Sequence, residues 1–378
     1  MSDLSLQHQQ AATQLPVHSY FDPALFEREK RLLFDGGPRY VGHALAVPNP
    51  GDYSTLAQEQ NGRALVRNAQ GQVELISNCC RHRQAIMLGG RGNLQGQGKG
   101  HAGGNIVCPI HRWTYAPGGQ LLGAPHFAHD PGLDLSNYAL REWNGLLFED
   151  NGRDIAQDLA GMKVAGELSF EGYALDHVEL HECNYNWKTF IEVYLEDYHV
   201  GPFHPGLGNF VTCDDLSWQF GRDYSVQTVG VAPTFGRPGS DAYKLWHEVL
   251  LRYQGGELPT RGAIWLTYYP HIMVEWYPHV LTVSTLHPIG PEKTLNMVEF
   301  FYPEEIACFE REFVEAQRAA YMETAVEDDE IGERMDAGRR ALMLRGDNEV
   351  GPYQSPMEDG MQHFHEWYRR AMGLAVTT

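Results

Sequence analysis

The chain has 378 residues, of which 43% are hydrophobic and 21% charged, so it can bury cores of ordinary globular size in two domains. Its formal net charge is −20, from 29 basic and 49 acidic residues, and such a charge repels nucleic acid and anionic membrane surfaces. We therefore expect neither a nucleic-acid partner nor membrane association; a basic face on a protein partner would suit this surface.

The cysteine content and the N-terminal segment indicate in which cellular compartment the protein is expected. Six cysteines in 378 residues are too few for a disulfide framework. Residues 1–18 are polar and lack the basic and apolar regions of a signal peptide. No stretch approaches the roughly 18 uninterrupted apolar residues of a membrane span. We expect a cytoplasmic protein.

The N-terminal part of the chain predicts one helix followed by a β domain. Residues 22–34 alternate apolar and charged positions after an Asp22–Pro23 start signal. From about residue 40 the pattern changes to short β-rich runs separated by turn signals such as Asn61–Gly62. We predict a small all-β domain over residues 40–157, preceded by a helical segment, residues 1–39, that packs on the second domain.

Two short motifs inside this β domain each combine a cysteine with a histidine. Cys80-x-His82 and Cys108-x-x-His111 offer two thiolates and two imidazoles, which is a metal-ligand set. A tetrahedral zinc site and a [2Fe–2S] centre with two histidine ligands both fit this spacing. Cys79 lacks the one-residue spacing to His82, and we interpret it as a buried small residue.

The residues around the motifs favour the iron–sulfur centre. The second motif contains Pro109 and is followed by Trp113, Tyr115 and Gly118–Gly119, which shape a tight apolar loop suited to shielding a cluster. Residues 91–105, between the motifs, are rich in Gly and Gln. We interpret them as a mobile loop insertion without regular structure.

The second half of the chain mixes helical and strand patterns. Residues 185–199 have helical periodicity, with aromatic and aliphatic side chains on one face. Residues 263–288 and 294–303 are aromatic and β-branched, and we predict that they form strands of a larger sheet. Residues 304–342 predict a long helix.

Two histidines come at the end of the helix predicted for residues 185–199. On a straight helix, side chains five residues apart, such as those of His199 and His204, point about 140° apart. Gly201–Pro202 lies between them and ends the helix, so that His204 can turn back toward His199. Two imidazoles and one carboxylate would form a facial triad typical of non-haem Fe(II) and oxygen chemistry. Two capped histidines at a helix end are the alternative interpretation.

The two motif regions together resemble the α subunits of Rieske non-haem iron oxygenases. C-x-H, a gap, and C-x-x-H followed by W-x-Y are similar to the Rieske motif, and "NWKTFIEVYLEDYHVGPFHPGL" resembles the catalytic-iron segment. The resemblance extends to "FDPALFERE" near the N-terminus and "MQHFHEWYRR" near the C-terminus. The gap of residues 83–107 is longer than is usual in the family, because residues 91–105 supply the excess.

The resemblance implies the ligands of a [2Fe–2S] cluster. Cys80 and Cys108 would hold one iron, and His82 and His111 would hold the other. Neutral imidazoles in place of thiolates remove negative charge and raise the reduction potential.

The resemblance also implies a mononuclear Fe²⁺ held by His199, His204 and a later acid. The family's E–D pattern matches Glu327–Asp328 best, so we predict Asp328 as the third ligand, with Asp329 as the alternative. Glu196 would link a Rieske histidine of one subunit to an iron-bound histidine of the next, orienting both rings and carrying the electron path.

The fold implied by the resemblance is α+β. A Rieske [2Fe–2S] domain would be followed, at residues 158–378, by a helix-grip catalytic domain of the START/Bet v1 type with a large antiparallel sheet. The expected activity is that of an oxygenase component, which takes electrons from NAD(P)H through a separate flavin/iron–sulfur reductase or ferredoxin. It would activate O₂ and hydroxylate or demethylate a small organic substrate. A homotrimer is expected.

The substrate class and the rival functions stay open at this point. Residues 265–279, with Trp218, Phe220 and Trp246, would wall a cavity for an aromatic ring or a trimethylammonium group, or else belong to the core. A glutamate at position 196 is shared with relatives that act on carnitine and choline. Monooxygenation and dioxygenation, the latter as in aromatic hydrocarbon catabolism, both fit. A Rieske electron carrier and a zinc-stabilised helix-grip binding protein are the rivals.

Overall fold

The computed structural model describes residues 14–374, and the chain divides into two compact units. The β unit spans Pro38–Ile155, and the α+β unit joins the N-terminal segment up to Gly37 to Ala156–Thr378. The signal-peptide prediction concerns residues 1–18, most of which lie outside the described residues. Within residues 14–374, no helix is both long and apolar enough to traverse a bilayer.

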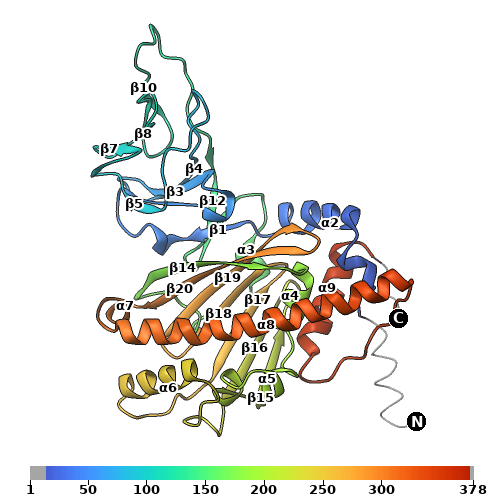
Figure 1. Cartoon of the computed structure of the whole chain (residues 1–378). Coiled ribbons are helices and arrows are strands. Elements are labelled where there is room, and N and C mark those ends of the chain that lie inside the picture. Colours follow the sequence, from blue (N-terminus) through green and yellow to red (C-terminus); the bar gives the residue numbers. More distant parts are fainter. Residues whose placement is uncertain (1–13, 375–378) are drawn as a thin grey trace, which may run out of the picture. The chain divides into compact units, whose positions relative to one another are not determined.

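The β unit consists of three small antiparallel sheets (Figure 1). The first has the order β1 (Tyr40–His43), β13 (Leu146–Glu149), β12 (Leu140–Trp143). The second has the order β11 (Asn137–Tyr138), β4 (Val73–Ser77), β3 (Arg63–Arg67), β2 (Asp52–Thr55), β5 (Arg91–Asn93). The third has the order β10 (Leu121–Gly123), β9 (Thr114–Tyr115), β8 (Asn105–Val107), β7 (His101–Ala102), β6 (Gln97–Gly98). Two 3₁₀ turns, η3 (Ala44–Ala46) and η4 (Ala57–Glu59), connect the early strands.

The prediction of an unstructured loop over residues 91–105 is wrong. β5, β6 and β7 lie in this segment and extend the second and third sheets. Gly100 has a φ of +102°, and a Cβ there would lie 2.0 Å from the Met87 carbonyl oxygen. A Cβ on Gly98 would lie 2.4 Å from the His101 ring. The glycines permit close strand pairing here, a use that their frequency alone does not distinguish from a loop.

The α+β unit is built on a seven-stranded antiparallel sheet, as the sequence predicted. Its order is β14 (Tyr173–Cys183), β20 (Lys293–Pro303), β19 (Val280–Gly290), β18 (Ile272–Tyr277), β17 (Ala263–Tyr268), β16 (Tyr224–Val231), β15 (Val211–Phe220). Every residue of β17 is buried. Strands shielded on both faces carry the continuous apolar pattern seen in the sequence.

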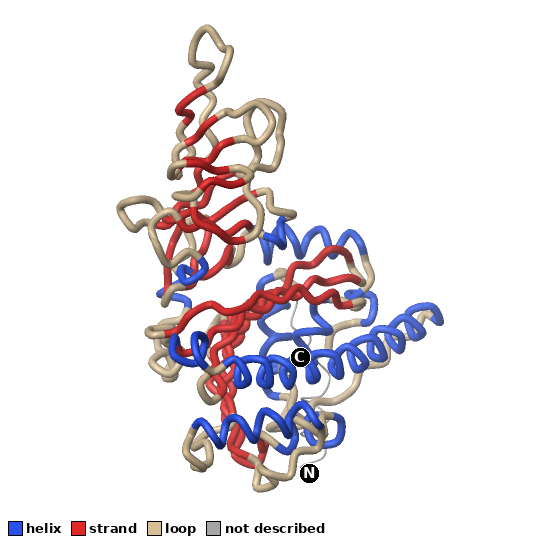
Figure 2. The backbone as a smooth tube through the Cα atoms, turned by 60° about the vertical axis from the view of Figure 1, so that its left-hand side comes forward, coloured by secondary structure: helices blue, strands red, loops and turns tan. Residues whose placement is uncertain are grey.

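Helices complete the core of this unit and lie along the sheet (Figures 1 and 2). α6 (Asp241–Tyr253) and α8 (Arg311–Arg345) share one apolar cluster with the strands, in which Trp246, Phe300 and Phe313 take part. α2 (Pro23–Glu29), α4 (Trp187–Tyr194) and α9 (Asp359–Ala371) form a second cluster with residues of β18 and β19. The shorter helices are η1 (Val17–Tyr20), η2 (Lys30–Asp35), α3 (Ile155–Asp158), α5 (Val200–Phe203), η5 (Leu207–Asn209) and α7 (Glu304–Phe309).

Two predicted helices differ in extent from those of the structure. The helix predicted for residues 185–199 ends at Tyr194, and Gly201–Pro202 lies inside the short helix α5 and does not end a longer one. The helix predicted for residues 304–342 is interrupted at Glu310, where φ is −113° and ψ is 58°, and α8 then continues to Arg345.

Candidate metal centres and substrate cavity

The two Cys–His motifs of the β unit form two loops with the same backbone hydrogen bonds. Cys80 donates its N–H to the Ala85 carbonyl (2.9 Å) and accepts from the Gln84 N–H (2.9 Å). Cys108 likewise donates to the Trp113 carbonyl (2.8 Å) and accepts from the Arg112 N–H (3.0 Å). Gln84 and Arg112 both have positive φ, 55° and 62°. Each loop therefore turns tightly around one cysteine.

The four side chains of the motifs fit an iron–sulfur cluster. Cys80 and Cys108 are each 2% exposed within the apolar core of the β unit. The rings of His82 and His111 are 4.6 Å apart, and His82 stacks on Trp113 at 5.2 Å. His82 Nδ1 is buried without a hydrogen-bond partner, which suits a metal ligand. Cys79 is half-buried, with Sγ 3.8 Å from the Gly62 carbonyl oxygen.

The spacing of these donor atoms argues against a single tetrahedral ion. Among the described residues, two groups of three or more donor atoms come within 4.8 Å of one another, and both lie in the α+β unit. The four motif residues form no such group, so their separation favours a cluster of two irons over one zinc.

The second site lies around the short helix α5. His199 is its N-cap residue and His204 its C-cap residue, so one helical turn separates them. After α4 ends at Tyr194, the Asp197 N–H donates to the Met357 carbonyl at 3.0 Å and the His199 N–H donates to the Glu196 carboxylate at 3.1 Å, so neither continues the helical pattern. Both histidines lie against the middle of α8, where His199 approaches Asp328 and His204 approaches Glu327 and Asp328.

His199, His204 and Asp328, which we call the triad, place three donor atoms close together. The His199 and His204 Nε2 atoms are 3.0 Å apart. Asp328 Oδ1 lies 3.0 Å from His204 Nε2 and 3.5 Å from His199 Nε2. It is buried and lacks a hydrogen-bond partner of good geometry. Two imidazoles and one carboxylate converging in this way can hold an Fe²⁺ with open positions.

Each triad histidine has a carboxylate on its other ring nitrogen. Glu196 contacts His199 Nδ1, and Glu327 Oε2 lies 2.7 Å from His204 Nδ1. A carboxylate at Nδ1 fixes the ring so that Nε2 faces the ligand position. Burial lowers the pKa of His199, but the nearby carboxylates of Asp328 and Glu196 outweigh it and raise this pKa to about 10. A bound metal ion would displace such protons.

Asp329, the alternative ligand, lies away from the two triad histidines. Its carboxylate is 2.6 Å from His181 Nε2 and accepts the Tyr185 hydroxyl at 2.9 Å. Cys183 lies close enough to complete a second group with His181 and Asp329. Burial raises the pKa of the Cys183 thiol to about 12.

A cavity of about 830 Å³, part of it open to solvent, adjoins the triad. Seven aromatic side chains line it: Phe190, Tyr194, Tyr243, Trp246, Trp265, Tyr277 and Tyr321. Trp246 thus belongs to both the core and the cavity wall, whereas Trp218 and Phe220 do not reach the cavity. Tyr198 is 60% exposed.

The cavity contains two buried acids besides those at the triad. Glu275 and Asp197 are 2% and 4% exposed. Burial raises the pKa of both carboxyl groups to about 7. No lysine or arginine is among the described residues that line the cavity. Apart from the histidines, the ionisable groups among the described lining residues are therefore carboxyl groups and tyrosine hydroxyls.

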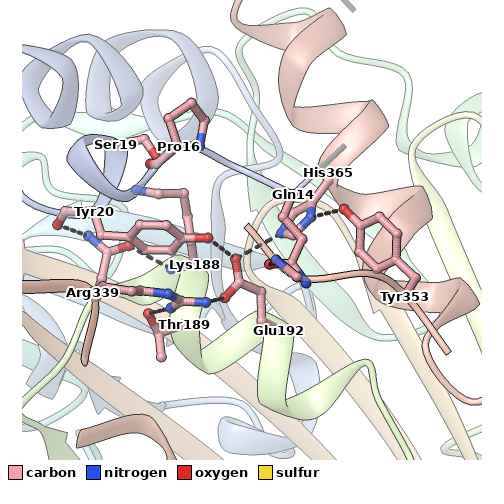
Figure 3. Close-up of polar contacts among 12 residues, drawn as sticks. Gln14, Pro16, Ser19, Tyr20, Lys188, Thr189, Glu192, Arg339, Tyr353 and His365 are labelled. Atoms are coloured by element: carbon pink, nitrogen blue, oxygen red, sulfur yellow. Dashed lines mark hydrogen bonds and ion pairs between the residues drawn. The ribbon is translucent and has the colours of Figure 1, made fainter. Parts of the chain in front are cut away.

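A buried charge network holds α4, the helix that precedes the triad (Figure 3). Glu192 is completely buried, and its carboxylate binds the Tyr20 hydroxyl, the Arg339 guanidinium and His365 Nε2, the last at 2.8 Å. Burial raises the pKa of Glu192, but Arg339 and His365 outweigh it and lower this pKa to about 2. The network ties α4 to the N-terminal segment, α8 and α9.

The sequence reasoning missed two residues of this site. Glu327 belongs to the family's E–D pattern, but that pattern predicts a role for Asp328 alone. Glu275 lies in the run Ile272–Tyr277, and a lone carboxylate among β-branched and aromatic residues is the signal that could have found it.

Comparisons with known proteins follow the same division of the chain. The model of the ring hydroxylating α subunit (catalytic domain) matches residues 170–374, and the Rieske [2Fe–2S] domain model matches residues 38–139. Putrescine 2-hydroxylase of Ralstonia nicotianae is 66% identical over 360 residues, covering 95% of this chain and 96% of that protein. Putrescine 2-hydroxylase of Bordetella bronchiseptica is 64% identical over 369 residues, covering 96% and 85%.

Solved structures of low sequence identity share the fold. A quaternary ammonium Rieske monooxygenase, whose structure was described in relation to carnitine oxidation and inter-subunit electron transfer, superposes with a TM-score of 0.74 at 20% identity, covering 96% of each chain. Naphthalene 1,2-dioxygenase from Rhodococcus sp. has a TM-score of 0.68 at 18% identity and covers 95% of this chain and 94% of its own. The catalytic-domain model spans more than half of the chain, so this protein belongs to the ring-hydroxylating α-subunit family of Rieske oxygenases, which carry a [2Fe–2S] cluster and a mononuclear iron.

Proposed function

We propose that this oxygenase hydroxylates putrescine, or a linear diamine very similar to it, at an aliphatic carbon. The identity of 66% and 64% to two putrescine 2-hydroxylases carries the proposal. The cavity supports it independently, because buried acids without lysine or arginine neighbours suit a cationic substrate. A diamine replaces both substrate classes considered from the sequence, aromatic compounds and quaternary ammonium compounds.

We propose the following ligands for the two centres. Cys80, His82, Cys108 and His111 hold the [2Fe–2S] cluster, and the triad holds the mononuclear Fe²⁺. When bound, the iron supplies the activation of O₂ that places one oxygen atom on the substrate, with electrons received by way of the cluster.

The chain's own residues supply position, orientation and a dry cavity. Glu196 and Glu327 hold the Nδ1 sides of the triad histidines, so that both Nε2 atoms face the metal position. The aromatic walls keep bulk water away from the reacting carbon. The second oxygen atom of O₂ leaves as water, formed with electrons and protons delivered from outside.

We further propose that the protein acts as a homotrimer with a separate reductase or ferredoxin. Glu196 would connect the Rieske histidine of a neighbouring subunit to His199. Exposed apolar side chains near the cluster motifs support a docking role for this surface: Ile110 is 61% exposed, and Phe127, 49% exposed, has its ring 6.0 Å from that of His82. All six cysteines are unpaired, which supports a reducing, cytoplasmic location.

The test is a single turnover of the protein loaded with iron and sulfide. The chemically reduced protein is mixed with putrescine and ¹⁸O₂, and the product is analysed by mass spectrometry. We expect a hydroxylated putrescine that carries one ¹⁸O atom. No labelled product from putrescine, together with product from choline or carnitine under the same conditions, would overturn the proposal.

A further inference from the structure

One buried acid of the cavity is used by neither metal centre. Glu275 lies on β18, opposite Trp265 of β17 and Thr282 of β19. It is 2% exposed, and within the described residues its carboxylate accepts hydrogen bonds from tyrosine hydroxyls. Burying an ionisable carboxyl without a cation costs free energy, so a strand interior is a poor place for it unless it serves a ligand.

Three tyrosines surround this carboxyl group. The Tyr277 hydroxyl donates to Glu275 Oε2 at 3.0 Å, and the Tyr321 hydroxyl donates to Oε1 at 2.8 Å. The Tyr194 hydroxyl is buried without a hydrogen-bond partner among the described residues. Tyr194 lines the same cavity as Glu275, and burial together with the Glu275 charge raises the pKa of its hydroxyl.

The hydrogen-bond acceptors that the protein leaves unused around Glu275 match the N–H donors of a primary ammonium group. A carboxylate has about four acceptor positions, of which the two tyrosine hydroxyls occupy two. The remaining acceptor positions and the free Tyr194 oxygen can receive the N–H donors of an –NH₃⁺ group. The surrounding aromatic faces add cation–π attraction.

We propose that Glu275, with the hydroxyls of Tyr194, Tyr277 and Tyr321, forms a primary-ammonium site that holds one end of the diamine in front of the triad. We call these four residues the amine anchor; the inference rests on the proposed function and names the residues behind its specificity. A trimethylammonium group has no N–H donor, so it gains only the cation–π attraction. The anchor thus selects primary amines over the quaternary ammonium compounds named for more distant relatives.

The test compares putrescine and choline binding to the metal-loaded protein and to its Glu275→Gln variant by titration calorimetry. For the intact protein we expect putrescine to bind more tightly than choline. In Glu275→Gln, the Kd for putrescine should rise by about 30-fold or more, because a hydrogen-bonded charge pair is lost. The ratio of the choline Kd to the putrescine Kd should fall in the same variant. Glu275→Asp keeps the charge and should recover part of the affinity.

A buried glutamate on the other face of the same sheet provides the matched control. Glu299 pairs with Val283 of β19, and Val283 pairs with Val274 of β18. Because Glu275 follows Val274 along β18, the Glu299 and Glu275 side chains lie on opposite faces of the sheet. Glu299→Gln should bind putrescine as the unmodified protein does. Thermal melting without ligand should show that Glu275→Gln is folded and at least as stable as the unmodified protein, because the uncompensated carboxyl is gone.

The outcomes separate the two proposals. If the unmodified protein binds putrescine and folded Glu275→Gln binds it equally well, the amine anchor is wrong and the proposed function stands. If Glu299→Gln loses as much affinity as Glu275→Gln, the effect is not local and the anchor is also wrong. If the unmodified protein binds no putrescine, the proposed function itself fails.

Discussion

At the scale of single residues, the two carboxylates on the triad histidines have similar geometry and different expected roles. Glu196 and Glu327 each sit at the Nδ1 atom of one triad histidine. Glu196 follows α4, whereas Glu327 belongs to α8 and precedes Asp328. We expect Glu196 to orient His199 and to connect subunits, and Glu327 only to orient His204.

The variants Glu196→Gln and Glu327→Gln test this difference. Glu196→Gln should keep its iron and its cluster spectrum but lose about 100-fold or more in turnover, because the link between centres is broken. Glu327→Gln, the matched control, should lose about 10-fold through poorer orientation of His204. Steady-state oxygen uptake with a reductase, together with iron analysis, measures both. Equal losses in the two variants would leave Glu196 with an orienting role alone.

Residues in short motifs could be predicted from the sequence, whereas residues brought in by the fold could not. Cys80 and His82 are two positions apart, so their spacing is visible in the chain itself. Asp328 required the resemblance to a family, because more than a hundred residues separate it from His204. Glu275 reaches the cavity only through the register of β17, β18 and β19, which no local pattern reports.

At the scale of elements, α4 owes its position to buried charges more than to helix propensity. It spans only Trp187–Tyr194, too short to be stable alone. Glu192 fixes it through Arg339 of α8 and His365 of α9 (Figure 3). The triad histidines follow directly after this helix, so the network supports the site from behind.

Replacing Glu192 tests how much this network contributes. Glu192→Gln leaves the Arg339 guanidinium buried with only the more distant Asp336 carboxylate, 3.4 Å away, as an anionic partner, and the free energy of unfolding should fall by about 3 kcal/mol. Urea denaturation measures the change. Glu182→Gln removes an exposed partner of Lys293 and should change stability by less than about 0.5 kcal/mol. An unchanged midpoint for Glu192→Gln would show that packing alone positions α4.

Helix and strand types were easier to predict than their ends. The periodicity of residues 185–199 indicated a helix, but after Tyr194 the Asp197 and His199 N–H groups bond to the Met357 carbonyl and the Glu196 carboxylate instead of continuing the helical pattern. Glycine-rich residues 91–105 have the composition of a loop, although they contain short strands that pair closely, as Gly98 does with His101. Both errors come from interactions that compete with local propensity.

At the scale of the whole molecule, the α+β class and the large antiparallel sheet were predictable because apolar strand patterns and turn residues recur along the chain. The family comparisons and the seven-stranded sheet confirm this prediction. The substrate was not predictable, because aromatic cavity walls accept a ring and a cation equally well. Buried acids without counter-ions, visible only in three dimensions, favour the cation.

The central claim is that one chain carries a two-iron cluster and a separate iron held by the triad. Iron and acid-labile sulfide should be measured in the intact protein and in the variants Asp328→Ala and Asp329→Ala. We expect about three irons and two sulfides per chain in the intact protein and in Asp329→Ala, but about two irons and two sulfides, with an unchanged visible spectrum, in Asp328→Ala. Zinc without sulfide in the intact protein, or about three irons retained in Asp328→Ala, would contradict the account.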